Sequence, residues 1–243
     1  MMEDYRILPC GDAALAVMLG DTISERTGER VRALADALSA GTVTGITELI
    51  PAFCSLTVCY DSAAVSYPKL CRRIEKAMSR ADGTTVSARR VHRIPVCYGG
   101  EFGPDLADVA SLAGLSAEEV IRRHSAPDYR IYMLGFLPGF PYLGGLDESI
   151  AAPRLDSPRE RIPRGSVGIG ASQTGIYPME SPGGWRLIGR TPILPYDPAR
   201  TPPVLYAAGD SIRFVPIDRA RYDELAAAVA AGTYIHQVTE ESI

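Results

Sequence analysis

The sequence predicts an α+β protein in two parts, a small α/β sandwich over residues 1–88 followed by a β-barrel over residues 89–243. Three observations support this prediction. The first part alternates apolar, β-branched segments with two segments of helical period. From Tyr129 onward the second part consists almost entirely of strand and turn signals. Between the two, the polar stretch Ser79–Arg90 has no apolar period and contains Gly83, which is typical of a domain boundary.

The elements of the first part follow the order of a ferredoxin-like sandwich. The first helix is expected to begin at a capping box of Thr22 and Glu25 and to end near Ala40, and a second helix starts near Ser66. The predicted strands are Tyr5–Leu8, Ala13–Leu19, Ile46–Ile50, Ser55–Tyr60 and one near Arg90 that completes the sheet. Two helices lying on one antiparallel sheet fit this order.

The second part begins with the strand His92–Tyr98 and continues with two short helices. The first helix carries apolar residues on one face, and the second is capped by Ser116 and Glu119. Near the end of the chain we expect a strand pair, Val204–Ala207 with Ile212–Ile217, and a closing helix over Asp218–Ala231 with Tyr222, Leu225, Ala226 and Val229 turned inward. A β-barrel with peripheral helices accommodates these signals most simply.

Glycine and proline concentrate between Gly135 and Gly189, where eleven of the 23 glycines occur. Glycine permits positive φ and close backbone approach, whereas proline fixes φ, so together they build defined loops. Aromatic and β-branched residues interrupt the glycines, and the only tryptophan, Trp185, is among them. The segment therefore indicates a folded, β-rich region with a functional surface.

Composition argues against several classes of function. A net charge of -4 disfavours a general nucleic-acid binder, which needs basic residues for the phosphates. No apolar stretch approaches the roughly 20 residues that span a bilayer, and the acidic N-terminus is unlike a signal peptide, so we expect a cytoplasmic location without membrane contact. The five cysteines include no CxxC pair, so we expect no metal site. P-loop, dinucleotide-binding, nucleophile-elbow and zinc-protease motifs are also missing.

Arginines give the clearest sign of a binding site. Six of them fall within the 37 residues from Arg154 to Arg190, alongside only three acids. Guanidinium groups bind carboxylate or phosphate through paired hydrogen bonds, so we expect an anion-binding face with Arg154, Arg159 and Arg190 as its leading members. Prolines close to Arg154 and Arg190 favour fixed positions, whereas a solvated charged loop is the alternative for Arg159.

Further candidates carry protons or hydrogen bonds. Glu101, in the turn after the strand His92–Tyr98, is placed to hold a metal, to orient a substrate ammonium or to act as a base. Of the three histidines, His92 is expected to be structural and His236 incidental, while His124 lies near a helix end where a capping role and a site role compete.

Neutral groups in the glycine-rich segment suit an amide substrate. Gln173 and Tyr177 offer hydrogen-bond donors and acceptors within the stretch ASQTGIYP. Trp185, which follows two glycines, is either an aromatic wall beside exposed backbone or an ordinary core residue.

Four motifs together resemble the allophanate hydrolase subunit 1 family. They are IPVCYGGEFGPDL (Ile94–Leu106), GFLPGFPYLGGL (Gly135–Leu146), PRGSVGIG with QTGIYP (Pro163–Pro178) and SPGGWRLIGRTP (Ser181–Pro192). The likeness covers nearly the whole chain and is most specific from His92 to Ile217. That family includes B subunits of bacterial ATP-dependent 5-oxoprolinases and an inhibitor of a sporulation histidine kinase. The resemblance implies a small N-terminal α+β domain and a C-terminal cyclophilin-like β-barrel.

The resemblance also implies a function. We expect an ATP-dependent 5-oxoprolinase subunit, inactive alone, that works with subunits C and A and uses ATP with Mg²⁺ to open 5-oxo-L-proline to L-glutamate. The site would lie at the partner interface, with arginines holding phosphate or substrate carboxylate and with Glu101, His124 and Gln173 as the catalytic groups. Two alternatives remain open, a binding protein that inhibits a histidine kinase and a subunit of an allophanate or urea-type amide enzyme.

Overall fold

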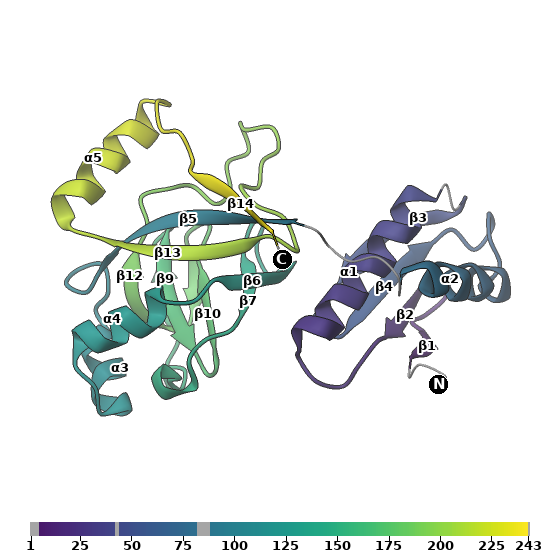
Figure 1. Ribbon diagram of the computed structural model, residues 1–243, viewed down its shortest axis with the longest axis horizontal. Coiled ribbons are helices and arrows are strands. Elements are labelled where there is room, and N and C mark those ends of the chain that lie inside the picture. The colour runs from purple at the N-terminus through teal and green to yellow at the C-terminus, as the bar shows by residue number, and fades with distance from the viewer. Residues whose placement is uncertain (1–4, 42–43, 82–87, 243) are drawn as a thin grey trace. The chain divides into compact units, whose positions relative to one another are not determined.

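The computed structural model describes residues 5–41, 44–81 and 88–242, and the chain divides into two compact units, Met1–Ser87 and Ala88–Ile243 (Figure 1). Residues 82–87, in the middle of the expected boundary, lie outside the described residues. Each unit has its own hydrophobic core. Strands and helices occur in both units, so the predicted α+β class is confirmed.

The first unit is a four-stranded antiparallel sheet with two helices on one face (Figure 1). Alternate residues of the two central strands point toward these helices, as the period of two requires, and Leu15, Leu34, Leu56 and Leu70 are fully buried between the layers. The strand order is β1, β2, β4, β3. The elements are β1 (Arg6–Pro9), β2 (Ala14–Met18), α1 (Glu25–Ala40), β3 (Ile46–Pro51), β4 (Ser55–Tyr60) and α2 (Tyr67–Ala81).

Two expectations for this unit are wrong. Helix α1 is capped by Ser24, whose hydroxyl accepts a hydrogen bond from the Thr27 backbone N–H, and not by Thr22. The strand expected near Arg90 does not complete this sheet, because it forms the start of β5 (Ala88–Tyr98), a strand of the second unit. Strand β1 occupies the position beside β2, so the unit is a two-layer α+β sandwich with an N-terminal hairpin.

The second unit is a barrel-like sheet of eight strands. They follow the order β10, β9, β12, β5, β13, β6, β7, with β14 paired to β5, and β10 lies against β7 so that the sheet nearly closes. Strands β8 and β11 form a separate pair. The strands are β6 (Tyr129–Leu134), β7 (Pro141–Gly144), β8 (Arg159–Ile162), β9 (Ser166–Gly170), β10 (Gln173–Ile176), β11 (Ser181–Gly183), β12 (Arg186–Arg190), β13 (Ser211–Ile217) and β14 (Val238–Ser242).

Alternation along the strands fills the barrel interior. Strands β5 and β13 run parallel, with Ile94 opposite Phe214, and both side chains are buried in the core. Helix α3 (Leu106–Ala113) packs on β12, α4 (Ala117–Ser125) packs on β13, and a short 3₁₀ turn, η1 (Glu148–Ile150), lies beside them. The predicted cap of α4 is confirmed, since the Ser116 hydroxyl accepts from the Glu119 backbone N–H.

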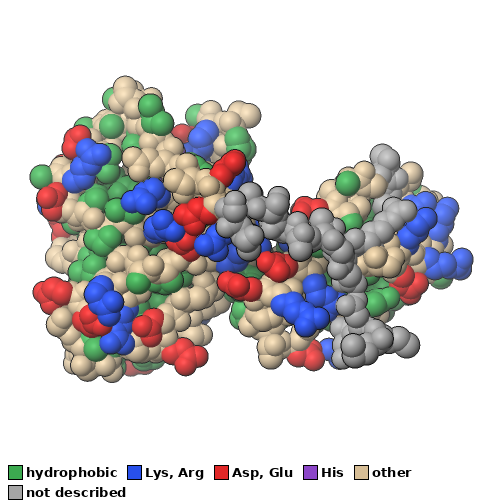
Figure 2. Space-filling model, in the orientation of Figure 1, with side chains coloured by type: hydrophobic (Ala, Val, Ile, Leu, Met, Phe, Trp, Pro, Cys, Tyr) green, Lys and Arg blue, Asp and Glu red, His purple; other side chains and the backbone are tan. Residues whose placement is uncertain are grey.

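Near the C-terminal end of the chain the sequence prediction is partly wrong. Val204–Ala207 is not a strand, because Val204 makes only an isolated bridge, and β13 pairs instead with β5 and β6. The closing helix, α5 (Arg219–Ala230), exists, but of the four residues expected to point inward only Leu225 is buried. No helix in the described ranges is both long and apolar enough to cross a membrane. Figure 2 shows acidic and basic side chains interspersed on the visible face of each unit.

Candidate functional site

A pocket of about 300 Å³ lies in the second unit, where the glycine-rich loops meet. Tyr142 comes from β7, Gln173 from β10 and Gly183 from β11, and the remaining residues come from the adjoining loops. The lining consists of Phe136, Phe140, Tyr142, Arg154, Gln173, Tyr177, Gly183, Gly184 and Trp185. The structure therefore brings together four of the predicted site residues, Arg154, Gln173, Tyr177 and Trp185.

The wall of this pocket is an aromatic cluster around Phe140. Its ring packs edge to face against Tyr142, Tyr177 and Trp185, with ring centroids 5.5 to 5.6 Å apart. Such edge-to-face packing is favourable and restricts each ring to a narrow range of orientation. Phe136, at the rim, has a φ of 66° and is 65% exposed, an uncommon conformation for a residue with a side chain. The wall is therefore rigid, and one further ring is presented to solvent.

Two glycines leave the room that this cluster needs. A Cβ at Gly170 would lie 2.4 Å from the Trp185 indole, and a Cβ at Gly183 would lie 2.6 Å from the Tyr177 hydroxyl. Carbon atoms in proteins essentially never approach so closely, so any other residue at either position would displace a ring of the wall. The glycine density noted in the sequence thus has a direct structural cause.

The polar groups of the pocket are few and available for binding. Arg154 is exposed, and neither its guanidinium nor the Gln173 amide has a hydrogen-bond partner among the described residues. Burial raises the pKa of Tyr177 to about 12, although a hydrogen bond from the Trp185 backbone and the positive charges of Arg154 and Arg159 oppose this rise. The phenol is therefore neutral at pH 7. One cation, one amide and one neutral hydroxyl face an aromatic wall, an arrangement suited to a small, flat, anionic molecule.

Arg159 does not line the pocket. Its guanidinium forms an ion pair with Asp105 (Nη2 to Oδ1, 2.7 Å), and the other carboxylate oxygen accepts a hydrogen bond from the Leu187 backbone N–H at 2.6 Å. Asp105 is 5% exposed and makes no side-chain cap for α3, so it ties the helix start to β12. Arg159 therefore forms a structural ion pair, and its positive charge lowers the pKa of Tyr177. The anion-binding role of Arg159 stays a prediction.

Glu101 and Arg190 lie together at a different place, beside the start of α5. The guanidinium groups of Arg190 and Arg219 both lie over the Phe102 ring, 5.0 and 4.7 Å from its centroid, and Arg219 forms an ion pair with Glu101. The ion pair and the cation–π contact hold Arg219 in place, and the cation–π contact holds Arg190, whose Nε is buried without a hydrogen-bond partner among the described residues. The structure does not bring Glu101 or Arg190 into the pocket.

His124 lies inside the barrel, fully buried and stacked on Phe214 with ring centroids 4.6 Å apart. The Thr174 hydroxyl donates its proton to the Gly168 carbonyl, so the Thr174 oxygen must accept a hydrogen bond from His124 Nε2–H. The other imidazole nitrogen, Nδ1, therefore carries no proton and accepts a hydrogen bond from the Tyr98 hydroxyl at 2.8 Å. Burial lowers the pKa of His124 to about 3. A neutral imidazole with both nitrogens satisfied serves the packing of the core, and the geometry places His124 outside the pocket.

Sequence analysis missed two parts of the molecule. It overlooked Phe136, Phe140 and Tyr142 as parts of the aromatic wall, although three aromatic residues among the glycines and prolines of GFLPGFPY were a usable signal. It also treated His236 as incidental, whereas the structure places its Nε2 3.0 Å from His92 Nδ1, and His92 Nε2 lies 3.0 Å from Asp210 Oδ2. These residues are too distant in sequence for any local pattern to have joined them.

Comparisons with known proteins agree with this architecture. The family model for the carboxyltransferase domain, subdomain C and D, matches residues 5–206. The B subunit of the 5-oxoprolinase from Bacillus subtilis (strain 168) is 45% identical over 232 residues, covering 91% of this chain and 97% of that protein. The structure of TTHA0988 matches with a TM-score of 0.75 and 39% identity over 84% of this chain, which spans only 40% of TTHA0988.

A more distant structure shows the fold alone. The urea amidolyase of K. lactis superposes with a TM-score of 0.81 at 19% identity, over 98% of this chain and 16% of the amidolyase. The similarity to the B. subtilis protein extends over nearly the full length of both chains, and the family model covers both units. This chain therefore belongs to the carboxyltransferase subdomain C and D family, and within it to the 5-oxoprolinase B subunits.

Proposed function

We propose that this chain is the B subunit of an ATP-dependent 5-oxoprolinase and that the pocket lined by Arg154, Gln173, Tyr177 and Trp185 binds 5-oxo-L-proline. One observation carries the proposal. A cation and an amide that have no hydrogen-bond partner within the described ranges, and a neutral phenol, converge on an aromatic wall in a pocket of about 300 Å³. Pockets of this size and composition are typical of small-molecule sites.

The chemical groups of 5-oxoproline match this lining. The molecule is a five-membered lactam that carries a carboxylate. The Arg154 guanidinium provides two parallel N–H donors for the carboxylate, and the Gln173 amide both donates and accepts, as the lactam C=O and N–H require. The flat ring packs against Trp185 and Phe140. Tyr177, kept neutral by burial, donates to an oxygen of the bound molecule.

The reaction needs groups that the described part of this chain does not supply. Transfer of the ATP γ-phosphoryl group to the lactam oxygen activates the carbonyl carbon. Water then attacks that carbon, and the C–N bond breaks to give a free amine and an acyl phosphate. A second water hydrolyses the acyl phosphate, which releases phosphate and leaves L-glutamate. The pocket has a single unpaired guanidinium and the sequence has no P-loop, so we place the binding of ATP and Mg²⁺ with subunits C and A. The longer chain of TTHA0988, in which the matched segment is joined to further sequence, supports such a partner.

The fold names implied by the resemblance form part of the same proposal. A nearly closed eight-stranded sheet supports a cyclophilin-like barrel in the second unit. Two helices on one face of an antiparallel sheet support a ferredoxin-like ancestry for the first, with β1 in the place of the last strand. A cytoplasmic location stays a prediction.

The test is to coexpress the chain with its C and A partners and to measure 5-oxoproline-dependent ATP hydrolysis. We expect Arg154→Gln to raise the KM for 5-oxoproline about ten- to hundred-fold, the loss of a charge-assisted hydrogen bond. Gln173→Ala should lower kcat/KM similarly. Arg161→Gln is the matched control, because the Arg161 side chain is 82% exposed and forms an ion pair with the exposed Glu180.

Several outcomes would contradict the proposal. An assembled complex without turnover would refute the enzymatic role, and unchanged kinetics in the Arg154 and Gln173 variants would show that the pocket is not the substrate site. Affinity purification that retains a histidine kinase in place of enzyme subunits would favour the inhibitor alternative. Turnover of allophanate in place of 5-oxoproline would favour the amide-enzyme alternative.

A further inference from the structure

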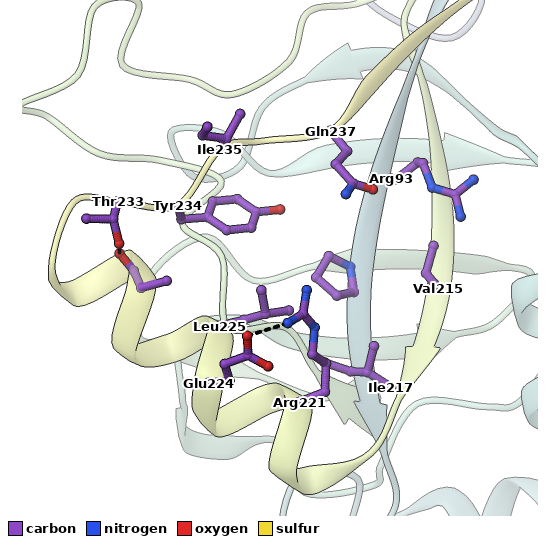
Figure 3. A pocket seen from close by; sticks show the side chains of 12 residues that line it. Arg93, Val215, Ile217, Arg221, Glu224, Leu225, Thr233, Tyr234, Ile235 and Gln237 are labelled. Carbon is purple, nitrogen blue, oxygen red and sulfur yellow. Dashed lines mark hydrogen bonds and ion pairs between the residues drawn. The ribbon is translucent and has the colours of Figure 1, made fainter.

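A second cavity, of about 390 Å³, lies on the outside of the barrel and shares no residue with the pocket described above. It is enclosed by β5, β13, α5 and the segment 233–237 (Figure 3). The residues that line it are Arg93, Pro95, Val215, Ile217, Arg221, Glu224, Leu225, Ala228, Thr233, Tyr234, Ile235 and Gln237.

The cavity exists because α5 covers the sheet incompletely. Along β5 and β13 the inward residues fill the barrel core, so Pro95, Val215 and Ile217 point to the outer face. Helix α5 crosses this face but buries only Leu225. An apolar floor is therefore left between the helix and the sheet, and burying a short hydrocarbon chain on it would be favourable.

Polar groups surround this floor, and their balance is positive. Arg221 is paired with Glu224 (Nη1 to Oε1, 2.6 Å), whereas the Arg93 guanidinium has no acidic or carbonyl partner among the described residues. In Figure 3 the Tyr234 phenol and the Arg221 guanidinium extend toward the centre of the cavity, whereas Arg93 lies at its edge, on the side of Gln237, with its guanidinium turned outward. Burial raises the pKa of Tyr234, although the charge of Arg221 opposes the rise, so the phenol stays a neutral donor.

We propose that this cavity binds a small organic carboxylate with a short apolar body. The carboxylate pairs with Arg93 and accepts from the Gln237 amide, while the hydrocarbon lies on Val215, Ile217 and Leu225. The single uncompensated charge favours a monoanion, because a cation would be repelled and a polyphosphate would need several guanidinium groups. The apolar floor favours a chain over a bare inorganic ion.

Titration calorimetry of the full chain tests this proposal, with sodium hexanoate as the probe and acetate, hexan-1-ol and inorganic phosphate as comparisons. Hexanoate should bind most tightly, because of the four compounds only hexanoate has both a carboxylate to pair with the Arg93 guanidinium and a hydrocarbon chain to cover the apolar floor. Arg93→Gln should weaken hexanoate binding about ten- to hundred-fold, the effect of losing one charge-assisted hydrogen bond. Arg93→Lys, which keeps the charge, should retain part of the affinity. Amide NMR signals of Thr233 and Gln237 should shift on binding, while those of Gln173 should not.

Two controls locate the binding. Arg154→Gln removes the cation of the other pocket and should leave hexanoate affinity unchanged, so failure of the 5-oxoprolinase proposal does not affect this one. Arg161→Gln controls for loss of a surface charge. Equal affinity in wild type and Arg93→Gln, phosphate or acetate binding as tightly as hexanoate, or no detectable hexanoate binding would each overturn the proposal. Circular dichroism of the Arg93 variants shows whether they remain folded.

Discussion

Acidification from pH 7 to pH 5 should destabilise the barrel unit through His124. In the native state burial holds the pKa of this imidazole at about 3, whereas an unfolded histidine titrates near its ordinary value of about 6.5. Below pH 6.5 the unfolded state therefore binds a proton that the native state does not. The stabilisation is fully present above pH 6.5 and is lost as the pH falls toward 3.

The magnitude follows from linkage. Each pH unit in this window costs about 1.4 kcal/mol, so the fall from about pH 6.5 to 5 removes roughly 2 kcal/mol from the free energy of unfolding. The hydrogen bonds give the physical reason, because Thr174 and Tyr98 together satisfy only one imidazole proton. Protonation of Nδ1 would force the Tyr98 hydroxyl to turn its proton into the buried core.

Urea denaturation followed by Trp185 fluorescence measures this effect in the barrel unit alone, because Trp185 is the only tryptophan and lies in that unit. The variant His124→Gln keeps one donor and one acceptor but does not titrate. At pH 7 this substitution should lower the free energy of unfolding by roughly 1–3 kcal/mol, because the packing of the imidazole ring is lost. Between pH 7 and pH 5 the free energy of unfolding of the variant should then fall by about 2 kcal/mol less than that of wild type.

His236 is the second contributor, since burial lowers its pKa to about 4, and the neighbouring His92 and Arg200 act in the same direction. The variant His236→Gln, made alone and with His124→Gln, separates the two histidines. If wild type and His124→Gln lose the same free energy on acidification, the assignment of a neutral, proton-locked His124 is wrong.

Two further predictions concern the groups around the candidate site. Gly170→Ala should destabilise the barrel by about 1–3 kcal/mol because its Cβ would overlap the Trp185 indole, and urea denaturation checks this. Gly184→Ala, whose Cβ meets nothing closer than 3.6 Å, should cost less than about 1 kcal/mol, and equal losses would contradict the steric argument. Asp105→Asn should cost about 1–3 kcal/mol by weakening one buried and one part-buried hydrogen bond to the carboxylate, whereas Asp108→Asn, at an exposed carboxylate, should stay near wild type.

Much of the candidate site was predictable from sequence. Arg154, Gln173, Tyr177 and Trp185 were chosen for their chemistry within a glycine-rich segment, and the fold brings all four to one pocket. Glu101, Arg159, Arg190 and His124 were chosen on equally sound chemical grounds but lie elsewhere, three of them in ion pairs or ring contacts and one in the core. Residue type indicates which interactions a side chain can make. Its neighbours in the folded protein decide whether those interactions are already made within the protein or remain available to a ligand.

The sequence by itself determined the features that depend on near neighbours. The end of α1 at Ala40, the Ser116 cap and the strands Ser55–Tyr60 and Ser211–Ile217 arise from periodicity and from hydrogen bonds within a few residues. Only the tertiary structure decided which strands pair, and it assigned the residues near Arg90, which were expected to complete the first sheet, to the start of β5 in the barrel.

The same division holds for the buried polar groups. The chain of contacts from Asp210 through His92 to His236, and the ion pair between Arg159 and Asp105, each join residues more than fifty positions apart. Their formation depends on burial, which removes competing water and makes an unpaired charge costly. That condition exists only after the barrel has closed, so no local pattern in the sequence encodes it.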